Sequence, residues 1–419
     1  MTDRIFTINH IGGKGDGVGL INDRHVYVPY ALPGEIWAQR TDGSIHLISA
    51  SPSRSTDKCP HYRRCGGCIA QHFPRQAYED WKVALVKQAF ARRGIEIEPD
   101  PLVTVPPRSR RRAALTAITS RAGVVLGFHR ARSTQIEDLA DCAVLAPSIT
   151  AALDGLRELI TCLDFRNAPL RIRLLVTNEG LDIEISGMTQ TVSAPKLSRL
   201  AELAVNNGFA RLTLDGQTVL QRDQPHLAMS GVSIPLSSSR FVQAVAAAEN
   251  AMVDRVLAAC DDAKEAADLF CGVGTFTFAL ARKKKVHAVD GDGDALNALK
   301  HARDRATGLK PITTQHRDLF REPLSRNELN PFAFVVFDPP RSGARAQALQ
   351  LAESQVETIV AISCQPGTLA RDSRILVDGG YELETVTPID QFQFSSHIET
   401  VAVFRKHKTR KQHPRRAAS

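Results

Sequence analysis

The chain has 419 residues, of which 43% are hydrophobic and 23% charged. This balance is ordinary for a folded globular protein and excludes a largely low-complexity chain. The 53 lysines and arginines outnumber the 45 acidic residues, so the formal net charge of +8 favours an anionic partner without identifying it.

Hydropathy and cysteine usage indicate the compartment. No apolar run approaches the ~20 residues that a membrane span needs, and the first residues lack the charged-then-apolar order of a signal peptide. We therefore expect a cytoplasmic protein with no membrane partner, and a monomer by default. In that compartment the 8 cysteines are expected to be thiols or metal ligands rather than disulfides.

Residues 1–52 alternate apolar and polar side chains over short runs that glycines interrupt. This pattern predicts several short strands that form a small β-barrel. The blocks Gly15–Leu20 and Ala31–Glu35 resemble the TRAM domain, a barrel of OB type found on RNA-modifying enzymes. The resemblance implies a strand face that binds nucleic acid. The alternative is a structural barrel with no ligand.

The next segment, residues 53–234, opens with three clustered cysteines, Cys59, Cys65 and Cys68, in a C-x5-C-x2-C pattern. A tetrahedral site needs a fourth ligand, for which Cys142 is the candidate. Glycine-rich turns let backbone N–H groups point at sulfur, which suits a soft metal centre. Zinc and a four-iron cluster both accept four thiolates, and the spacing alone does not separate them.

The remainder of residues 53–234 predicts an α+β central domain. Period-two and helical patterns indicate helices over 76–94 and 194–207 and strands over 114–118, 170–176 and 180–185. The basic block Arg108–Arg112 precedes the first of these strands, where it suits contact with phosphates, although such blocks are also often plain solvated surface.

The catalytic domain is expected to span residues 235–405, followed by a basic tail over 406–419. An alanine-rich helix is predicted from Ser239 to Cys260, followed by a strand over 263–269. Strands then alternate with helices, which predicts a doubly wound, mostly parallel sheet that binds its ligand outside the carboxyl ends of the strands.

A glycine turn within Asp268–Phe276 connects the first of these strands to a helix over 275–282. Asp290 ends the next strand, about twenty residues on, where a carboxylate can accept hydrogen bonds from ribose hydroxyls. The pattern predicts a nucleoside site without naming the nucleoside. The turn lacks the third glycine of a dinucleotide fingerprint, so an ordinary tight turn is the alternative.

Reactive side chains follow the later strands of this sheet. Asp338 begins an Asp-Pro-Pro-Arg turn after a strand that ends at Phe337, and Cys364 follows the next buried strand. A thiol beside a positive crevice can be held as the nucleophilic thiolate, although a strand-end cysteine is more often a small core residue. His397 and Glu399 are expected on one face of an edge strand, where the carboxylate can accept a proton.

Together these motifs resemble the RNA (uracil-5-)-methyltransferase family over nearly the whole chain. The shared patterns are Asp-Leu-Phe-Cys-Gly-Val-Gly, Asp-Pro-Pro-Arg-x-Gly, Ser-Cys-x-Pro-x-Thr-Leu-Ala-Arg-Asp and His-x-Glu-x-Val. With the cysteine cluster and the TRAM-like start, the chain is most similar to the branch that has both a TRAM domain and an iron–sulfur cluster, whose members act on large-subunit ribosomal RNA.

The resemblance implies a Rossmann-like methyltransferase domain that binds S-adenosylmethionine and forms 5-methyluridine in RNA, with 23S ribosomal RNA favoured. It implies Cys364 as the nucleophile that attacks uracil C6 and Glu399 as the base that removes the C5 proton. The implied cofactor contacts are Gln243, Phe270, Thr275, Asp290, Asp318 and Asp338. The implied ligands of a [4Fe-4S] cluster are Cys59, Cys65, Cys68 and Cys142.

Two positions depart from the family pattern. Gln365 follows the nucleophilic cysteine where the family usually has Asn, and Asp290 stands where Glu is common. Neither change removes a reactive group. The open alternatives are the same chemistry on transfer RNA, a non-catalytic RNA-binding iron–sulfur protein, and a methyltransferase acting on protein or adenine. The last class favours an Asn-Pro-Pro-Tyr-type turn, whereas this chain has Asp-Pro-Pro-Arg.

Overall fold

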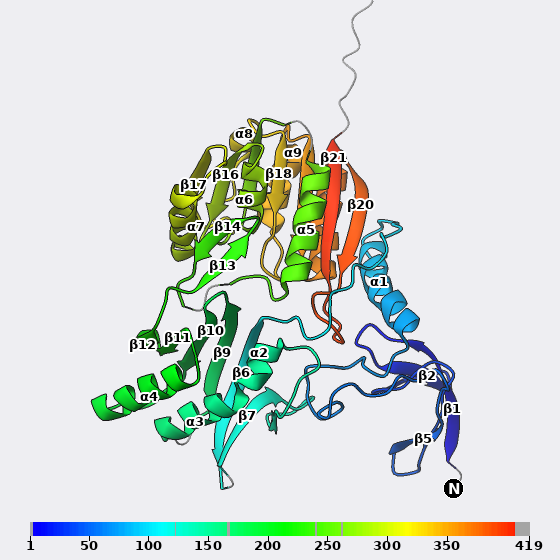
Figure 1. Cartoon of the computed structure of the whole chain (residues 1–419). Helices are drawn as coiled ribbons and strands as arrows, with labels where there is room; N and C mark the ends of the chain where they lie inside the picture. The colour runs from blue at the N-terminus through cyan, green and yellow to red at the C-terminus, as the bar shows by residue number, and fades with distance from the viewer. Residues whose placement is uncertain (1–2, 122, 166–167, 239–240, 261–262, 407–419) are drawn as a thin grey trace, which may run out of the picture.

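The computed structural model describes residues 3–121, 123–165, 168–238, 241–260 and 263–406. Three bodies are visible in Figure 1: a small N-terminal sheet, a central sheet with helices on one side, and a larger sheet near the top with helices on both faces. No helix in the described part of the chain is long and apolar enough to cross a membrane.

The N-terminal sheet is antiparallel, with the strand order β3-β2-β1-β4-β5. Its strands are β1 Arg4–Ile11, β2 Gly17–Ile21, β3 Arg24–Val28, β4 Ile36–Gln39 and β5 Ile45–Ser49. Phe6, Ile8 and Val28 form its core, and a Cβ at Gly19 would lie 2.6 Å from the ring of Phe6. The predicted short strands are therefore confirmed, whereas their closure into an OB-type barrel stays a prediction.

The central body is a seven-stranded sheet with the order β12-β11-β10-β9-β6-β7-β8. Its strands are β6 Arg112–Ser120, β7 Gly123–His129, β8 Ile136–Asp138, β9 Leu170–Thr177, β10 Gly180–Ser186, β11 Arg211–Leu214 and β12 Gln217–Gln221. Helices α2 Pro147–Ala151, α3 Leu153–Leu163 and α4 Ala194–Asn206 cover it. The predicted strands over 114–118, 170–176 and 180–185 and the helix over 194–207 lie at these places.

The third body is a seven-stranded sheet with the order β17-β16-β15-β18-β19-β21-β20. Its strands are β15 Glu265–Leu269, β16 Lys285–Asp290, β17 Ile312–His316, β18 Phe334–Phe337, β19 Thr358–Ser363, β20 Tyr381–Ile389 and β21 Glu399–Lys406. The pairings from β17 to β19 are parallel, and β21 pairs antiparallel with both β19 and β20. The doubly wound sheet is confirmed.

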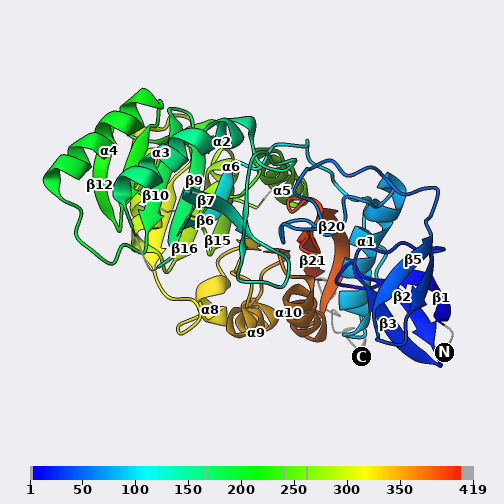
Figure 2. The same ribbon diagram turned by 90° about the horizontal axis from the view of Figure 1, so that it is seen from below.

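Helices lie on both faces of this sheet. They are α5 Ala246–Ala259, α6 Thr275–Ala281, α7 Gly293–Arg305, α8 Arg326–Leu329, α9 Arg345–Glu353 and α10 Pro366–Asp378. Figure 2 shows α5 and α6 on one face and α8, α9 and α10 on the other. The hairpin of β13 His226–Met229 and β14 Val232–Pro235 packs into the same core as α5 and α6, so residues before 235 also contribute to this body.

Two predictions about the catalytic sheet are wrong in detail. The helix predicted from Ser239 begins only at Ala246: residues 239–240 lie outside the described residues, and the segment 241–245 is not helical. Val245 is extended because it forms a β-bridge with Arg110, and this tertiary pairing overrides the helical propensity of the alanines.

The strand that carries Glu399 is not at an edge. β21 is paired on both sides, whereas β20, for which no strand was predicted, forms the edge of the sheet. His397 precedes the strand in a loop, so it does not share a strand face with Glu399.

Helix α1, Arg75–Ala91, connects the N-terminal sheet to the catalytic body (Figures 1 and 2). The helix predicted over 76–94 is confirmed, and its Val86 and Phe90 pack in the core beneath α10. Lys82 on the same helix is fully buried, and its Nζ lies 2.8 Å from Oδ1 of Asp390. The ammonium also donates to the backbone oxygens of Phe392 and His397, at 3.1 and 2.6 Å. Lys82 thus holds the loop that leads into β21.

The buried ion pair predicts a large difference between two lysines of one helix. Lys82→Met leaves the Asp390 carboxylate buried, with the Tyr78 hydroxyl as its one side-chain donor among the described residues, so we expect a loss of about 3–5 kcal/mol in the free energy of unfolding. Lys87→Met removes an ion pair with Glu98 that is exposed on both sides and costs ~0–1 kcal/mol. Urea denaturation followed by tryptophan fluorescence measures both; equal midpoints would contradict this role of Lys82.

Candidate active site

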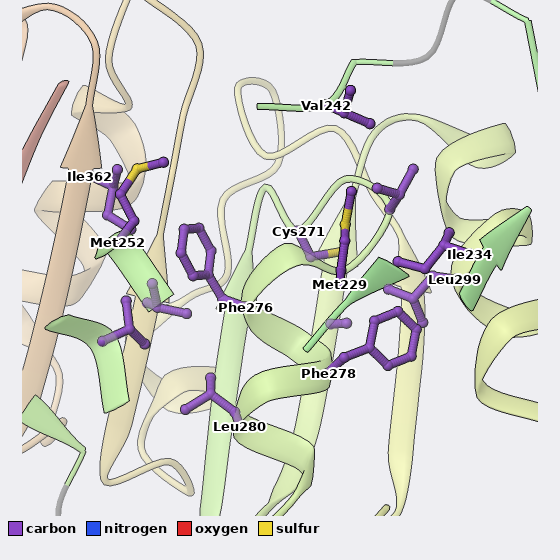
Figure 3. Packing of buried hydrophobic residues seen from close by; sticks show 14 of the residues in the cluster. Met229, Ile234, Val242, Met252, Cys271, Phe276, Phe278, Leu280, Leu299 and Ile362 are labelled. Atoms are coloured by element: carbon purple, nitrogen blue, oxygen red, sulfur yellow. The ribbon is translucent and has the colours of Figure 1, made fainter. Parts of the chain in front are cut away.

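The turn between β15 and α6 brings backbone close to the crevice at the carboxyl end of the sheet. Gly274 has φ of +102°, and a Cβ there would lie 2.7 Å from the ring of Phe278, so the turn requires glycine. Phe270 also adopts a left-handed conformation, with φ of +61°. Cys271 is buried and packs beside Met229 and Phe276 in the core, as Figure 3 shows. Burial raises the pKa of the Cys271 thiol well above its usual value, so this cysteine is a packing residue.

Asp290, at the end of β16, organises this turn. Its Oδ2 accepts a hydrogen bond of 2.7 Å from the Gly272 N–H, and its Oδ1 accepts one of 2.7 Å from the Asp292 N–H. Burial raises the pKa of Asp290 despite these hydrogen bonds. A carboxylate oxygen can accept more than one hydrogen bond, so Asp290 can also bind hydroxyl groups of a ligand.

Two further carboxyl groups lie near Asp290. Asp268 on β15 is fully buried; its Oδ2 accepts from the Thr277 hydroxyl at 2.5 Å, and its Oδ1 has no hydrogen-bond partner among the described residues. Burial raises the pKa of Asp268 to about 7, and burial likewise raises the pKa of Asp338 to about 7. Asp338 and Asp290 each raise the pKa of Asp268 further. Asp290 and Asp338, at the carboxyl ends of β16 and β18, favour a ligand that carries positive charge at this edge of the sheet, whereas Asp268 itself is fully buried.

Asp338 is connected to Glu399 by two buried glutamines. Gln243 donates from Nε2 to Oδ2 of Asp338 at 3.1 Å, and its Oε1 accepts from Nε2 of Gln391 at 2.9 Å. The same Nε2 of Gln391 donates to Oε2 of Glu399 at 2.9 Å. Sequence reasoning had selected Gln243, Asp338 and Glu399 but missed Gln391, which lies in a loop without any recognisable pattern.

Cys364 and Glu399 come together because β19 and β21 are antiparallel neighbours. Ser363 pairs with Thr400, so the next residues along the two strands are Cys364 and Glu399. Burial raises the pKa of Glu399 to about 8, and Asp338 adds to the increase. The pKa of Cys364 is raised overall: burial is the main cause and the Glu399 charge adds to it, whereas the nearby Arg341 guanidinium offsets part of the increase. Sequence reasoning also missed Arg341, although it lies in the Asp-Pro-Pro-Arg motif.

The other expected cofactor contacts lie around the same crevice. Thr275 begins α6 directly after the glycine turn and is nearly buried. The ring of Phe270 lies 5.3 Å from that of the half-exposed Phe320. Asp318, beyond β17, accepts a hydrogen bond of 2.9 Å from the Phe320 N–H. The structure therefore brings all six expected contacts to one edge of the sheet, with Asp318 at its periphery.

The four expected metal ligands line one cavity of about 430 Å³, together with Arg341, Phe392 and His397. Burial is the main cause that raises the pKa values of Cys65, Cys68 and Cys142, and the neighbouring cysteines of the group, Cys59 included, raise them further. Backbone N–H groups point at these sulfurs: the Gly67 N–H donates to Sγ of Cys65 at 3.4 Å, and those of Val144 and Leu145 contact Cys142. Such donors stabilise thiolates. Within the described residues, no group of three His, Cys, Asp or Glu side chains has the arrangement that a single metal ion requires.

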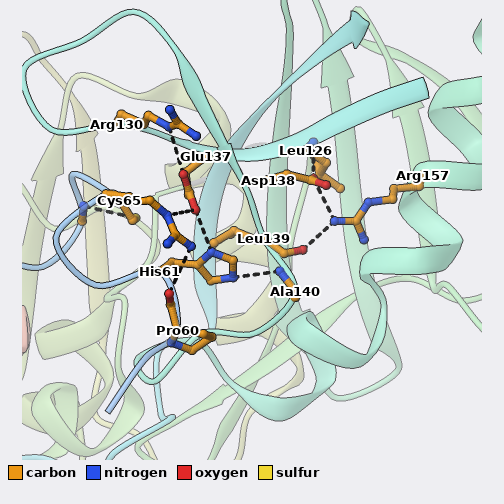
Figure 4. Close-up of polar contacts among 12 residues, drawn as sticks. Pro60, His61, Cys65, Leu126, Arg130, Glu137, Asp138, Leu139, Ala140 and Arg157 are labelled. Carbon is orange, nitrogen blue, oxygen red and sulfur yellow. Dashed lines mark hydrogen bonds and ion pairs between the residues drawn. The ribbon is translucent and has the colours of Figure 1, made fainter. Parts of the chain in front are cut away.

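A polar network joins the two segments that carry these cysteines (Figure 4). The Ala140 N–H donates to Nε2 of His61 at 3.0 Å, so the ring proton is on Nδ1 and donates to Oε1 of Glu137 at 3.0 Å. Arg64 and Arg130 hold the same carboxylate, at 2.8 and 2.9 Å. The loop of residues 59–68 is thereby fixed beside the segment that contains Cys142.

Comparison with known proteins identifies relatives along the whole chain. The model of a family described as tRNA (Uracil-5-)-methyltransferase matches residues 230–407. An uncharacterized RNA methyltransferase from Brucella suis is 45% identical over 404 residues, which cover 96% of this chain and 97% of that protein. A 23S rRNA (uracil(1939)-C(5))-methyltransferase from Edwardsiella ictaluri is 30% identical over 420 residues, which cover 96% and 95%.

The fold also matches solved structures. The crystal structure of a tRNA (uracil-54, C5)-methyltransferase from Pyrococcus abyssi, in complex with S-adenosyl-L-homocysteine, superposes with a TM-score of 0.72 at 21% sequence identity. The match covers 96% of this chain and 99% of that one. The multi-domain architecture with a Rossmann-like domain at its C-terminal end is therefore shared.

The effect of the Arg341 charge on the pKa of Cys364 can be tested by alkylation of the thiol. Arg341→Met removes the positive charge that lowers the pKa of the thiol, so we expect alkylation of Cys364 by iodoacetamide at pH 8 to slow by ~3-fold or more. The midpoint of its pH dependence should move upward. Mass spectrometry of the peptide that contains Cys364 measures the rate, with Arg345→Met as the matched control; equal rates for the two variants would exclude an effect of Arg341 on the thiol.

Proposed function

Because the chain belongs to the RNA (uracil-5-)-methyltransferase family and is an S-adenosylmethionine-dependent enzyme of that type, we propose that it forms 5-methyluridine in 23S ribosomal RNA through a covalent adduct. The observation that carries this proposal is the pairing of β19 with β21, which brings the Cys364 thiol beside the Glu399 carboxylate at the edge of the crevice. The two groups have the roles that uracil chemistry requires.

Uracil C5 is a poor nucleophile in its resting state. Attack of the Cys364 thiolate on C6 breaks the C5–C6 double bond and moves its electron pair toward O4 as an enolate, which makes C5 a carbon nucleophile. Arg341 favours the thiolate form, because its positive charge lowers the pKa of Cys364.

Glu399 is the proposed base. Once C5 carries the methyl group, the carboxylate removes the C5 proton, the C5–C6 double bond forms again and the thiolate leaves. A pKa of about 8 makes the Glu399 carboxylate more basic than that of an exposed glutamate. Part of the enzyme population still has Glu399 ionised near neutral pH, as a base requires.

The crevice fits the methyl donor. S-adenosylmethionine supplies the methyl group from a sulfonium centre and brings net positive charge, which suits the two acids at this edge, Asp290 and Asp338. We assign hydrogen bonds with the ribose hydroxyls to Asp290. The full set of proposed contacts is Gln243, Phe270, Thr275, Asp290, Asp318 and Asp338.

The proposed RNA surface is basic. Arg110, Arg112, Arg171 and Arg173 line a groove of about 500 Å³, where the guanidinium of Arg112 lies 4.3 Å from the exposed ring of Phe241. Arg111 is instead bound to Glu249 at 2.8 Å, so the block is only partly available to phosphates. Flipping a stacked uridine into the site costs roughly a few kcal/mol, which contacts with the flanking RNA offset.

We favour ribosomal over transfer RNA because the relative from Edwardsiella ictaluri is a 23S rRNA (uracil(1939)-C(5))-methyltransferase that covers 96% of the chain at 30% identity. We also propose that residues 1–52 form a TRAM-like barrel and that the central and catalytic domains span 53–234 and 235–405 along the chain, with the β13–β14 hairpin at the end of the first packed against the second. The basic tail, from Lys406 onward, lies outside the described residues except for Lys406 itself, which ends β21.

The four-cysteine cavity is the proposed site of a [4Fe-4S] cluster, held by Cys59, Cys65, Cys68 and Cys142. Its donor set of four sulfurs, that of Cys142 buried and the others partly buried, with backbone N–H groups beside two of them, fits a soft metal centre. The choice of iron–sulfur over zinc rests on the family resemblance. We assign the cluster a structural role, because the methyl transfer itself moves no electron.

Catalysis is tested in a strain that lacks the protein. We expect the wild-type gene to restore 5-methyluridine at one position of 23S ribosomal RNA, measured by mass spectrometry of RNA fragments, and Cys364→Ala to restore none while it still binds S-adenosylmethionine. Glu399→Gln should slow release of the methylated RNA from Cys364 by ~10²–10⁴-fold, so that a denaturant-stable protein–RNA adduct accumulates and is visible on a gel.

Each alternative gives a different result. Restoration in transfer RNA would replace the proposed substrate, and no restoration of any methylated uridine would favour a non-catalytic RNA-binding protein. Full activity of Cys364→Ala would contradict the covalent mechanism, and the absence of an adduct with Glu399→Gln would exclude Glu399 as the base.

The cluster is tested by metal and sulfide analysis of protein purified without oxygen. We expect about four iron and four sulfide per wild-type chain, and loss of most of both in Cys142→Ser because one thiolate ligand is removed. Cys162→Ser, which changes a partly buried cysteine on α3, should keep them. One zinc and no iron in the wild type would overturn the assignment.

A further inference from the structure

Gln391 lies two residues after the end of β20 and has a fixed amide orientation. Its Oε1 accepts from the backbone N–H of Val245 at 3.2 Å, which leaves Nε2 to face Glu399 and Gln243. Because Gln243 must then accept at Oε1, its own Nε2 is the group that donates to Asp338. One backbone N–H thus sets the orientation of both amides.

The three residues that these hydrogen bonds connect, Gln243, Gln391 and Glu399, are all buried. Gln243, Gln391 and Glu399 are 4%, 2% and 3% exposed, so solvent cannot easily replace a lost hydrogen bond. A hydrogen bond from an amide to a carboxylate is strengthened by the charge and by the low dielectric of the interior. Glu399 therefore depends on Gln391 for its orientation.

The backbone around Gln391 is itself held on both sides. Its N–H donates to the Ile389 oxygen at 2.9 Å, and the Asp390 N–H donates to the Val103 oxygen at 2.8 Å. The Asp390 side chain forms the buried ion pair with Lys82. The amide is thus presented from a rigid loop, as an element that orients a catalytic group requires.

We propose that Gln391 is a positioning residue, which fixes the carboxylate of Glu399 for removal of the uracil C5 proton and ties it to Gln243 in the cofactor crevice. This inference rests on the proposed function. It assigns to Gln391 the proton-removal step alone, because the hydrogen bonds of its amide within the described residues go to Val245, Gln243 and Glu399 and not to Cys364 or Arg341.

Three charged or titratable groups face Glu399 from neighbouring elements: Asp338 after β18, Arg341 in the following turn and Cys364 after β19. Asp338 raises the pKa of Glu399, whereas Arg341 lowers it. The hydrogen bond from Gln391 also lowers this pKa, since it stabilises the ionised form. Loss of Gln391 must therefore move the ionisation of Glu399 to higher pH.

The test separates formation of the covalent adduct from its breakdown. Wild-type protein and Gln391→Met are mixed with S-adenosylmethionine and total RNA from the strain that lacks the protein, and the adduct is followed on denaturing gels over a range of pH. We expect adduct formation within ~3-fold of wild type and breakdown slowed by ~10–100-fold, the usual effect of losing a hydrogen bond to a charged group. The pH midpoint of breakdown should rise by about one unit.

Gln347→Met is the matched control. Gln347 is also fully buried, and its amide hydrogen bonds to the backbone N–H and oxygen of Leu324, far from the crevice. Its loss should lower the melting temperature as Gln391→Met does, while the pH midpoint of breakdown stays at the wild-type value. The adduct of the double variant Gln391→Met/Glu399→Gln should break down no more slowly than the adduct of Glu399→Gln alone, because the two residues act in one step.

The outcomes are distinct. Slowed breakdown with normal formation supports the role of Gln391. Equal slowing of formation and breakdown, or an unchanged pH midpoint, overturns it and leaves Gln391 a structural residue. If the wild-type protein itself forms no adduct and no 5-methyluridine, the proposed function fails, which is a different result from an active wild type with an unaffected Gln391→Met.

Discussion

The active site depends on one exception in an otherwise parallel arrangement: β21 enters the sheet antiparallel, between β19 and β20. In a parallel sheet the carboxyl ends of the strands meet at one edge, and residues at the beginnings of strands lie at the opposite edge. Reversal of β21 brings the beginning of this strand, and with it Glu399, to the edge where Cys364 ends β19. A sheet with β21 in the parallel sense would separate the two groups by the length of the strand.

The same edge gathers acids that have little access to water. Asp268, Asp338 and Glu399 all have raised pKa values, chiefly because burial disfavours their charged forms. The cost of keeping them is offset by specific donors: the Thr277 hydroxyl, the amide of Gln243 and the amide of Gln391. Donors without charge orient these carboxylates. Arg341 is the cation whose charge lowers the pKa values of both Cys364 and Glu399.

Much of this arrangement could be predicted from the sequence because it is local. The glycine turn, Asp290 and the strand that leads to Cys364 are each defined within a few residues by period and by turn chemistry. The position of β21 could not be predicted this way, since an apolar run shows that a strand exists but not which strands flank it. The predicted start of α5 was wrong for a related reason. The alanines after residue 243 favour a helix locally, but the β-bridge between Val245 and Arg110 holds the backbone extended. The role of Gln391 could not be predicted, because a glutamine in a loop acts through hydrogen-bond partners that are distant in sequence, such as Gln243.

The network of His61 and Glu137 has a consequence for the order in which this protein matures. The groups that join the two cysteine-bearing segments are a histidine, a carboxylate and two arginines, none of which is among the proposed ligands. In small zinc domains the metal supplies the folding free energy, and a chelator unfolds the chain. Here the polypeptide closes the cavity with its own hydrogen bonds and ion pairs. The contacts that close the pocket are therefore supplied by the chain itself, so insertion of the proposed metal centre can follow folding.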